Sequence, residues 1–192
     1  FAYYPGAAQR YQQFSGIRCE TPDGRLPWML KTDLQLDDHP EMFLQESFVC
    51  VLGETSIGAG SSTEFLKQAV EFVNEQMTGT LAAGITIPSS FASQNHTQLD
   101  QALRQLRYGT IAINQWNALG FAWMSSPWGG YPGATLEEIQ SGIGTVHNTY
   151  LLAKPQKTVI YGPLRLFPKP VWYSQHACPD KVALRLLQLY AN

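Results

Sequence analysis

The chain has 192 residues, of which 44% are hydrophobic and 15% charged, and its formal net charge is −2. This balance is too apolar for a disordered chain and sufficient for one sizeable core. The small net charge and the lack of any Lys/Arg run exclude nucleic acid and anionic membranes as expected partners. The apolar runs fall far short of the ~20 residues that cross a bilayer, so we expect a soluble protein.

The cysteine content favours a reducing compartment. Cys19, Cys50 and Cys178 are an odd and sparse set, which argues against a disulfide framework. We therefore expect a cytoplasmic protein. The chain begins at Phe1 rather than at a methionine, so we also expect that part of the protein precedes it.

The N-terminal residues 1–40 are rich in Pro, Gly, Asp and Gln, and they predict an irregular lead-in with one or two short strands. The next run, ESFVCVLG at 46–53, is short, β-branched and aromatic and ends at a glycine. This is the profile of a buried strand. Cys50 lies inside it, so we expect an inert, buried thiol rather than a nucleophile.

The region 65–77 carries apolar residues at the spacing of one helical face. Ser61 and Glu64, three residues apart, form a capping box before this helix, and Gly79 predicts its end. The pattern predicts an amphipathic helix with one face turned toward the core.

Strands and helices then alternate. We predict a strand at 80–88, a helix capped by Thr97 that ends at Gly109, and a strand at 110–114. Strands separated by helices imply crossover connections, which predict an α/β fold with a mainly parallel sheet.

The segment 115–133 has no periodicity, and it holds Trp116, Phe121, Trp123 and Trp128 among Gly, Ser and Pro. We interpret it as a long aromatic loop. Such rings can stack on a sugar or a base, and they can equally fill the space under a loop.

The last third of the chain predicts three more elements. Thr135 and Glu138 predict a short helix, 157–162 a strand, and the residues from Val182 to Tyr190 a final amphipathic helix. The six residues at 135–140, TLEEIQ, receive no functional assignment.

Two possible ligand sites are weakly supported. Gly58 and Gly60 lie between a strand and a helix, where a phosphate loop would be, but the third glycine and the lysine of such loops are absent. A flexible connection is the favoured interpretation. The four histidines form no pair at metal-ligand spacing, so we predict no metal site.

Several segments in a fixed order resemble the C-terminal third of aldehyde dehydrogenases. In that family an E-x-F-G-P-V strand, a helix with a G-L-A-A-like strand, a G-x-x-x-V-N strand, a P-F-G-G loop and a closing K-x-V strand follow one another. The corresponding pieces here are QESFVCVL at 45–52, the helix and strand at 64–85, LRQLRYGTIAIN at 103–114, PWGGYPG at 127–133 and KTVIYG at 157–162. The resemblance covers about residues 40–165, and it implies a three-layer α/β fold around the sheet.

The resemblance implies two cofactor-binding residues. Glu46 matches the acid that hydrogen-bonds the nicotinamide ribose, and Phe48 matches the aromatic residue beside the nicotinamide ring of NAD or NADP. A carboxylate can accept from two neighbouring hydroxyls, and an aromatic face can form a wall of the cofactor site. Without the resemblance, they would be a strand-end acid and a core ring.

The resemblance also implies a substrate tunnel. Asn114 matches the asparagine that ends the G-x-x-x-V-N strand, and the loop with Trp116, Phe121, Trp123 and Trp128 matches the tunnel wall. Bulky rings at these positions favour an apolar or aromatic aldehyde as substrate.

The chain departs from the family pattern in informative ways. The family's F-G-P is replaced by Phe48-Val49-Cys50, and the segment 135–140 is added after Pro132-Gly133. The family's nucleophilic cysteine, its general-base glutamate and its Rossmann domain all precede the matched region, so we expect no catalytic residue in this chain.

We therefore predict an irregular lead-in at 1–40, the C-terminal part of a catalytic domain at 41–162 and a tail at 163–192. The family resemblance implies a homo-oligomer assembled through the closing strand. Two alternatives stay open: a non-catalytic interaction module that assembles through its sheet edge, and an independent nucleotide-binding domain that uses Gly58-Ala-Gly60.

Overall fold

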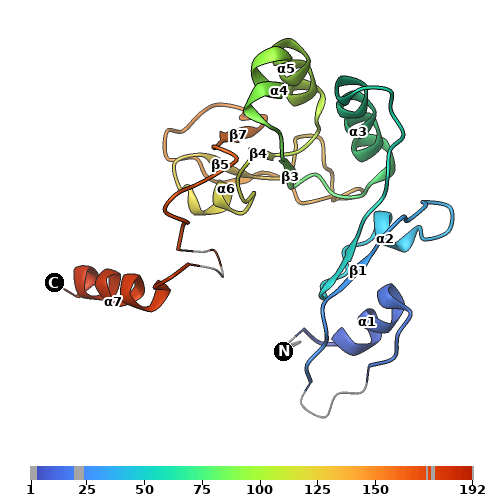
Figure 1. The fold of residues 1–192 in the computed structure, drawn as a ribbon, viewed down its shortest axis with the longest axis horizontal. Coiled ribbons are helices and arrows are strands. Elements are labelled where there is room, and N and C mark those ends of the chain that lie inside the picture. The colour runs from blue at the N-terminus through green and yellow to red at the C-terminus, as the bar shows by residue number, and fades with distance from the viewer. Residues whose placement is uncertain (1–3, 20–23, 172, 174–175, 192) are drawn as a thin grey trace.

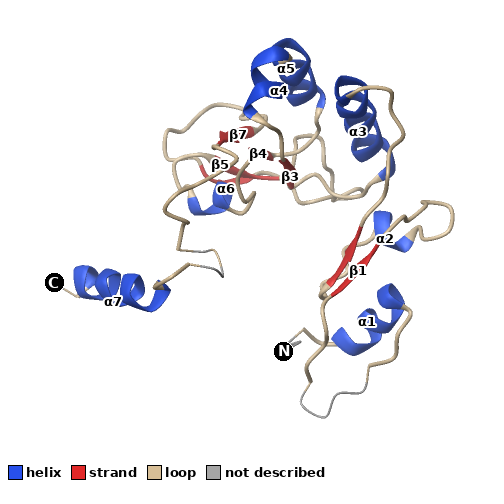
Figure 2. Ribbon diagram, viewed as in Figure 1, coloured by secondary structure: helices blue, strands red, loops and turns tan. Residues whose placement is uncertain are grey.

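The computed structural model of the chain describes residues 4–19, 24–171, 173 and 176–191. Short helices and strands alternate along these ranges and are joined by long loops (Figures 1 and 2). The mixed α/β class expected from the sequence is therefore confirmed. Among the described residues, no helix combines the length and apolar character that a bilayer crossing requires.

The N-terminal elements form a group with its own small core. Its elements are α1 (Ala7–Ser15), β1 (Met29–Lys31), α2 (Glu41–Leu44) and β2 (Val51–Gly53). Strands β1 and β2 are parallel, and Tyr11 and Phe14 of α1 are buried against Val51 of β2. The predicted lead-in strand is β1, whereas helix α1 was not predicted, because polar residues outnumber the apolar ones on it.

The strand predicted at 46–53 differs from the structure in length and in partner. Only its last three residues form β2, which pairs with β1 and not with the larger sheet. Cys50 therefore precedes the strand and is exposed, where we had predicted a buried thiol. Its thiol donates to the carbonyl oxygens of Leu26 (3.4 Å) and Pro27 (3.2 Å).

A second group of elements surrounds a three-stranded parallel sheet. In chain order its members are α3 (Ser62–Gln76), β3 (Ala82–Ile85), α4 (Ser89–Gln94), α5 (His96–Gln105), β4 (Thr110–Ile113), α6 (Leu119–Ala122), β5 (Pro127–Gly129), β6 (Thr145–His147) and β7 (Thr158–Tyr161). The sheet order is β3-β4-β7, and β5 and β6 form a separate antiparallel pair. Helices α3, α4 and α5 lie on one side of the sheet, and α6 and β5 lie on the other (Figure 1).

The parallel arrangement and the crossover helices agree with the prediction, but the strands do not form the single sheet that was predicted. The strands occur in three small sheets, because β2 joins β1 and the residues of the aromatic loop form β5 with β6. All four residues of β4 are buried, and Ile111 and Ile113 pack against Leu99 and Leu103 of α5. Strand β4 is thus the centre of the main core.

Helix α3 begins as its sequence predicts. The hydroxyl of Ser61 accepts from the Glu64 amide (3.2 Å), which satisfies one amide of the first turn. The Glu64 carboxylate accepts from the Gly60 amide (2.8 Å), one residue before the expected partner. The helix ends at Gln76, three residues before the predicted stop at Gly79.

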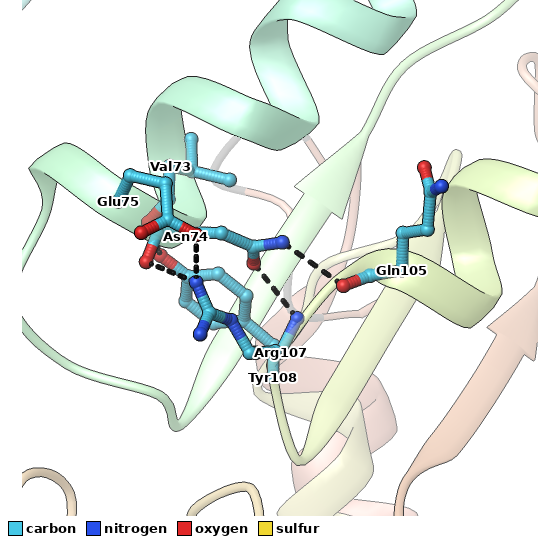
Figure 3. A network of polar contacts seen from close by, with 6 residues as sticks. All are labelled: Val73, Asn74, Glu75, Gln105, Arg107 and Tyr108. Atoms are coloured by element: carbon cyan, nitrogen blue, oxygen red, sulfur yellow. Dashed lines mark hydrogen bonds and ion pairs between the residues drawn. The ribbon is translucent and has the colours of Figure 1, made fainter.

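A polar network fixes the end of α3 to the end of α5 and to the segment that follows α5 (Figure 3). The Asn74 amide group donates to the Gln105 carbonyl (2.9 Å) and its side-chain oxygen accepts from the Arg107 amide (2.9 Å). The Arg107 guanidinium donates to the Asn74 carbonyl and to the Glu75 carboxylate. These bonds hold the two ends together at the surface, beside the buried Tyr108.

Lys157 joins β7 to the end of α5. Its ammonium group donates to the carbonyl oxygens of Leu103 (2.8 Å), Arg104 (3.1 Å) and Leu106. The last carbonyls of a helix have no partner within the helix, so the lysine supplies what the helix end lacks. Burial lowers the pKa of Lys157, which opposes the favourable effect of the carbonyls on its charge.

Other helix predictions are corrected. Thr97 is not a cap, because α5 begins at His96 directly after α4. The residues after Thr135 form no helix, although the Thr135 hydroxyl accepts from the Glu138 amide (3.1 Å). The predicted final helix is α7 (Pro179–Tyr190), which lies apart from the other elements in Figure 1.

Candidate functional site

The two predicted cofactor residues lie on the surface of the N-terminal group, between α2 and β2. Glu46 is exposed, and Phe48 exposes 55% of its surface. Phe48 has φ 49°, a left-handed conformation that costs a bulky side chain energy. Its ring lies 5.8 Å from that of Tyr4. The aromatic ring of Phe48 thus points outward from a strained backbone, and the strain does not serve to bury the ring.

The predicted aromatic loop contains short elements after all. Trp116, Phe121 and Trp123 lie on or beside α6 and are each more than half exposed. Trp128 lies in β5 and is half-buried. The centroid of the Phe121 ring lies 5.9 Å from that of Trp128 and 5.0 Å from that of His147 in β6. The structure therefore brings Phe121 and Trp128 together.

Asn114 is placed by the sheet. It follows β4 with φ 57°, and its backbone amide donates to the Ile85 carbonyl (2.9 Å). Its side-chain oxygen accepts from the Ile87 amide (2.9 Å). Asn114 thus fastens the carboxyl ends of β3 and β4 to each other, a structural role that the sequence did not predict.

A pocket of about 740 Å³ lies at the carboxyl ends of β4 and β7. Its walls include Gln115 after β4, Leu119 and Trp123 from α6 and its end, and Ile160 and Tyr161 of β7. Open parallel sheets bind ligands outside the carboxyl ends of their strands, so this is the position expected of a ligand site. The Tyr161 hydroxyl, like that of any tyrosine at neutral pH, is protonated and can donate a hydrogen bond.

The glycines of the PWGG segment permit close contacts between backbones. A Cβ at Gly129 would lie 3.1 Å from the Cα of Thr145 in β6, and one at Gly109 would lie 2.9 Å from the carbonyl carbon of Gly129. The second distance is shorter than real Cβ atoms show, and the first is shorter than nine in ten real Cβ contacts. The segment therefore passes directly over the start of β4, and this contact positions Trp128.

The two parts of the predicted site are separate. In Figure 1, α2 and β1 lie in the lower right of the view, apart from α6 and β5, and the segment with Glu46 and Phe48 joins α2 to β2, the strand that pairs with β1. The structure brings Trp123 to the pocket and Phe121 to Trp128, but it does not bring any of these residues to Glu46 or Phe48.

The glycine-rich loop before α3 is poorly suited to a phosphate. The Gly60 amide, which would face the anion, donates to the Glu64 carboxylate. A second negative group at this place would be repelled. The geometry thus favours the flexible connection over the phosphate loop.

Sequence reasoning missed two buried polar atoms near the aromatic residues. His147 Nε2 and Thr110 Oγ1 are buried without a hydrogen-bond partner among the described residues. Thr110 is completely buried beneath α6, where a Cβ on Gly120 would lie 2.6 Å from its methyl carbon. Nothing in the spacing of these residues marks them, because β4, α6 and β6 meet only in the tertiary structure.

Known proteins add no assignment to this geometry. The sequence matches no protein-family model, and it matches neither a curated protein nor a solved structure. Within the described ranges, no three His, Cys, Asp or Glu residues converge as metal ligands would. The fold and the site together define a mixed α/β protein with a pocket at the carboxyl ends of two parallel strands.

Proposed function

We propose that residues 41–162 are the C-terminal part of the catalytic domain of an NAD(P)-dependent aldehyde dehydrogenase. The observation that carries the proposal is the pocket at the carboxyl ends of β4 and β7, which has Trp123 in its wall. Its place on the sheet agrees with a ligand site of an α/β enzyme, and its lining agrees with an apolar or aromatic aldehyde.

In such an enzyme, a thiolate adds to the aldehyde, the nicotinamide accepts the hydride, and a water activated by a glutamate releases the acid. The thiolate and the glutamate would come from residues upstream of this chain. In this proposal residues 41–162 supply the substrate pocket and, at Glu46 and Phe48, groups for the cofactor. Because these two regions lie apart in the structure, hydride transfer requires that they approach each other when substrate and cofactor are bound.

The conformation of Phe48 supports a cofactor role. The Phe48 ring contacts that of Tyr4 and is 55% exposed, so burial does not account for its left-handed conformation, and strain of this kind occurs at ligand sites. The neighbouring Glu46 carboxylate is exposed and can accept hydrogen bonds from ribose hydroxyls. These side chains fit the nicotinamide end of NAD or NADP.

The pocket can be tested on the chain itself by heteronuclear NMR during titration with benzaldehyde. We expect the indole N–H resonance of Trp123 to shift in a saturable way and that of Trp28 to stay in place. Trp28 is the matched control, because it is 82% exposed and lies beside β1 in the N-terminal group. Equal shifts of both resonances, or none, would contradict a substrate site here.

The division of labour predicts an inactive fragment. Residues 1–192 by themselves should not reduce NAD or NADP in the presence of any aldehyde, because the thiolate and the base are expected elsewhere. An NAD-dependent rate from this chain alone would refute that division, whatever the NMR titration shows.

We also propose a cytoplasmic location. Cys19, Cys50 and Cys178 are all free thiols, which is the usual state of cysteines in a reducing compartment. Alkylation of the protein in cells followed by mass spectrometry tests this, because each thiol that is free in the cell gains an alkyl group, and fewer than three alkylated cysteines would contradict it.

The non-catalytic assembly module remains the second candidate. The observation in its favour is that β3 and β7 are the two outer strands of the sheet, each with one paired edge. The family resemblance favours the closing strand β7 as the point of assembly of a homo-oligomer.

A further inference from the structure

We propose that the pocket at the carboxyl ends of β4 and β7 takes a neutral aldehyde that carries a hydroxyl group, and that the side-chain amide of Gln115 selects this substrate. The substrate class rests on the proposed function, since the same pocket must hold the aldehyde. Gln115 is then a specificity-determining residue, because it binds a part of the substrate that does not react.

The walls of the pocket disfavour a charged substrate. Apolar side chains from α6, β7 and the segment after β7 make up most of the lining, and among the described residues no Asp, Glu, Lys, Arg or His contributes to it. A charged group that enters such a pocket gives up water and gains no opposite charge in return. Burial and, secondly, the Asp100 carboxylate raise the pKa of Tyr161, so a negative charge already acts on this wall and would repel an anion. A neutral substrate fits this lining.

Three uncharged polar side chains interrupt the apolar lining, and they are those of Gln115, Ser125 and Tyr161. Ligand pockets use a few polar groups to fix the orientation of an otherwise apolar ligand. An amide or a hydroxyl offers both a donor and an acceptor, and a hydroxyl on the substrate has the same two capacities. The volume of about 740 Å³ lies in the range of pockets that hold drug-sized ligands, so there is room for an aromatic ring with a substituent.

The fold leaves the amide of Gln115 without a protein partner. The residue is half-buried, and within the described part of the chain its side chain makes no hydrogen bond. Such an amide bonds to water, and an apolar ligand that displaces this water replaces none of those bonds, whereas a hydroxyl replaces one. One hydrogen bond of this kind changes affinity by about three- to tenfold. The amide therefore favours a substrate that carries a hydroxyl.

Gly162 allows the Gln115 side chain to lie across the end of β7. A Cβ on Gly162 would overlap the Nε2, Cδ and Cγ atoms of Gln115. The Gly162 amide donates to the Ile113 carbonyl at the end of β4 (2.9 Å), so the sheet fixes the backbone beneath this contact. The amide is thus in place before a substrate arrives, and binding loses little conformational entropy there.

Three substituted benzaldehydes test the substrate class on the chain itself, with the indole N–H resonance of Trp123 as the binding signal. They are meta-(hydroxymethyl)benzaldehyde, meta-methylbenzaldehyde and meta-formylbenzoate, which share a ring and differ in one substituent. We expect the hydroxymethyl compound to bind about three- to tenfold more tightly than the methyl compound, and the carboxylate to bind most weakly. Hydrophobicity alone would reverse the order of the first two, because the methyl group is the more apolar.

Variants assign the preference to the amide. Gln115→Met keeps the length of the side chain and removes the amide, so the hydroxymethyl compound should lose its advantage while the affinity for the methyl compound, which also reports a folded pocket, does not change. Gly162→Ala displaces the amide instead of removing it and should reduce the same preference. Gln101→Met is the matched control, because Gln101 is exposed on α5 and does not line the pocket, and it should keep the wild-type preference.

The wild-type titrations separate this substrate class from the proposed function. A saturable shift of the Trp123 resonance with equal affinities for the hydroxymethyl and methyl compounds would overturn the substrate class alone, as would tightest binding of meta-formylbenzoate. The lack of a saturable shift with any of the three would overturn both. An equal loss of affinity for the hydroxymethyl and methyl compounds in Gln115→Met would assign the amide to the aldehyde carbonyl that they share, and would overturn its role in selection.

Discussion

Gly109 lies where the start of β4 meets the PWGG segment, and its replacement by alanine should strongly destabilise the fold. Its amide donates to the Thr80 carbonyl (2.8 Å) and its carbonyl accepts from the Thr158 amide (2.8 Å), so both neighbouring strands hold it in place. A Cβ would overlap the Gly129 carbonyl oxygen and lie 3.1 Å from the carbonyl carbon of Gly130. These are backbone atoms, so no side-chain rotation relieves the overlap.

The size of the effect follows from this geometry. Overpacking in a well-packed core costs about 1–3 kcal/mol, and the upper end applies where backbone must move. Strand β5 is held by β6, with Gly129 opposite Thr145, and by the bond from the Tyr131 amide to Thr80 (3.0 Å). We therefore expect a loss of about 3 kcal/mol, and a melting temperature lower by roughly 6–12 °C at 2–4 °C per kcal/mol.

Urea and thermal unfolding, followed by circular dichroism, measure this effect. Gly58→Ala is the matched control, because a Cβ on Gly58 meets nothing within 4 Å. That variant should be unchanged or more stable by about 0.4–1 kcal/mol, since alanine restricts the unfolded chain. An unfolding midpoint for Gly109→Ala equal to that of the wild type would refute the close contact of β4 with β5.

Three further changes test the contacts around this core. Asn74→Ala removes the bridge between the end of α3 and the end of α5, and chemical denaturation should show a loss of about 1–2 kcal/mol. Lys157→Met removes the donors to the end of α5, and we expect the free energy of unfolding to fall by about 1–2 kcal/mol after allowance for the partial exposure of Lys157. Lys67→Met is the control and should cost less than about 0.5 kcal/mol, because the ion pair of Lys67 is at the surface. Burial raises the pKa of Tyr108 above its usual value of about 10, so the tyrosine contributes stability below that pH that is lost as pH rises through the folded-state pKa. Tyr108→Phe should reduce the alkaline loss of stability in unfolding curves on either side of pH ~10, and an unchanged alkaline slope would count against burial of the hydroxyl.

The elements that the sequence predicted well are those built from local interactions. Helix α3 follows from apolar spacing and from Ser61 and Glu64, which bond within one turn. Strands β3, β4 and β7 lie inside the predicted ranges, because each is a short apolar run; β4 is buried in the main core, and Ala83, Ile85 and Val159 of the other two pack against it. The helix from Thr135 failed for the complementary reason: the capping bond formed, but no apolar face follows to pack it against the core.

The pairing of β2 could not be read from its sequence. A short apolar run is equally suited to any sheet, and the choice of β1 over β3 depends on contacts with α1 that are distant along the chain. Residues before Val51 consequently bend away, which exposes Cys50 and turns Phe48 outward.

The candidate site also has features that the sequence predicts and features that only the fold determines. The sequence determined which residues could line an apolar pocket, since Trp116, Phe121, Trp123 and Trp128 are large rings in a segment without periodicity. Only the tertiary structure decided that Trp123 reaches the pocket, that Phe121 packs on Trp128, and that Asn114 is used to fasten two strands. These contacts join elements that meet through the parallel sheet, and sequence spacing contains no record of which elements will meet.

The PWGG segment shows both contributions. Its glycines mark, in the sequence alone, a place where a Cβ would be in the way. The structure identifies what lies against each glycine: Thr145 of β6 against Gly129, and Thr80 and Gly142 against Gly130. The sequence therefore determined that another backbone can approach closely here. Which backbone approaches depends on the packing of distant segments, and only the whole fold determined that.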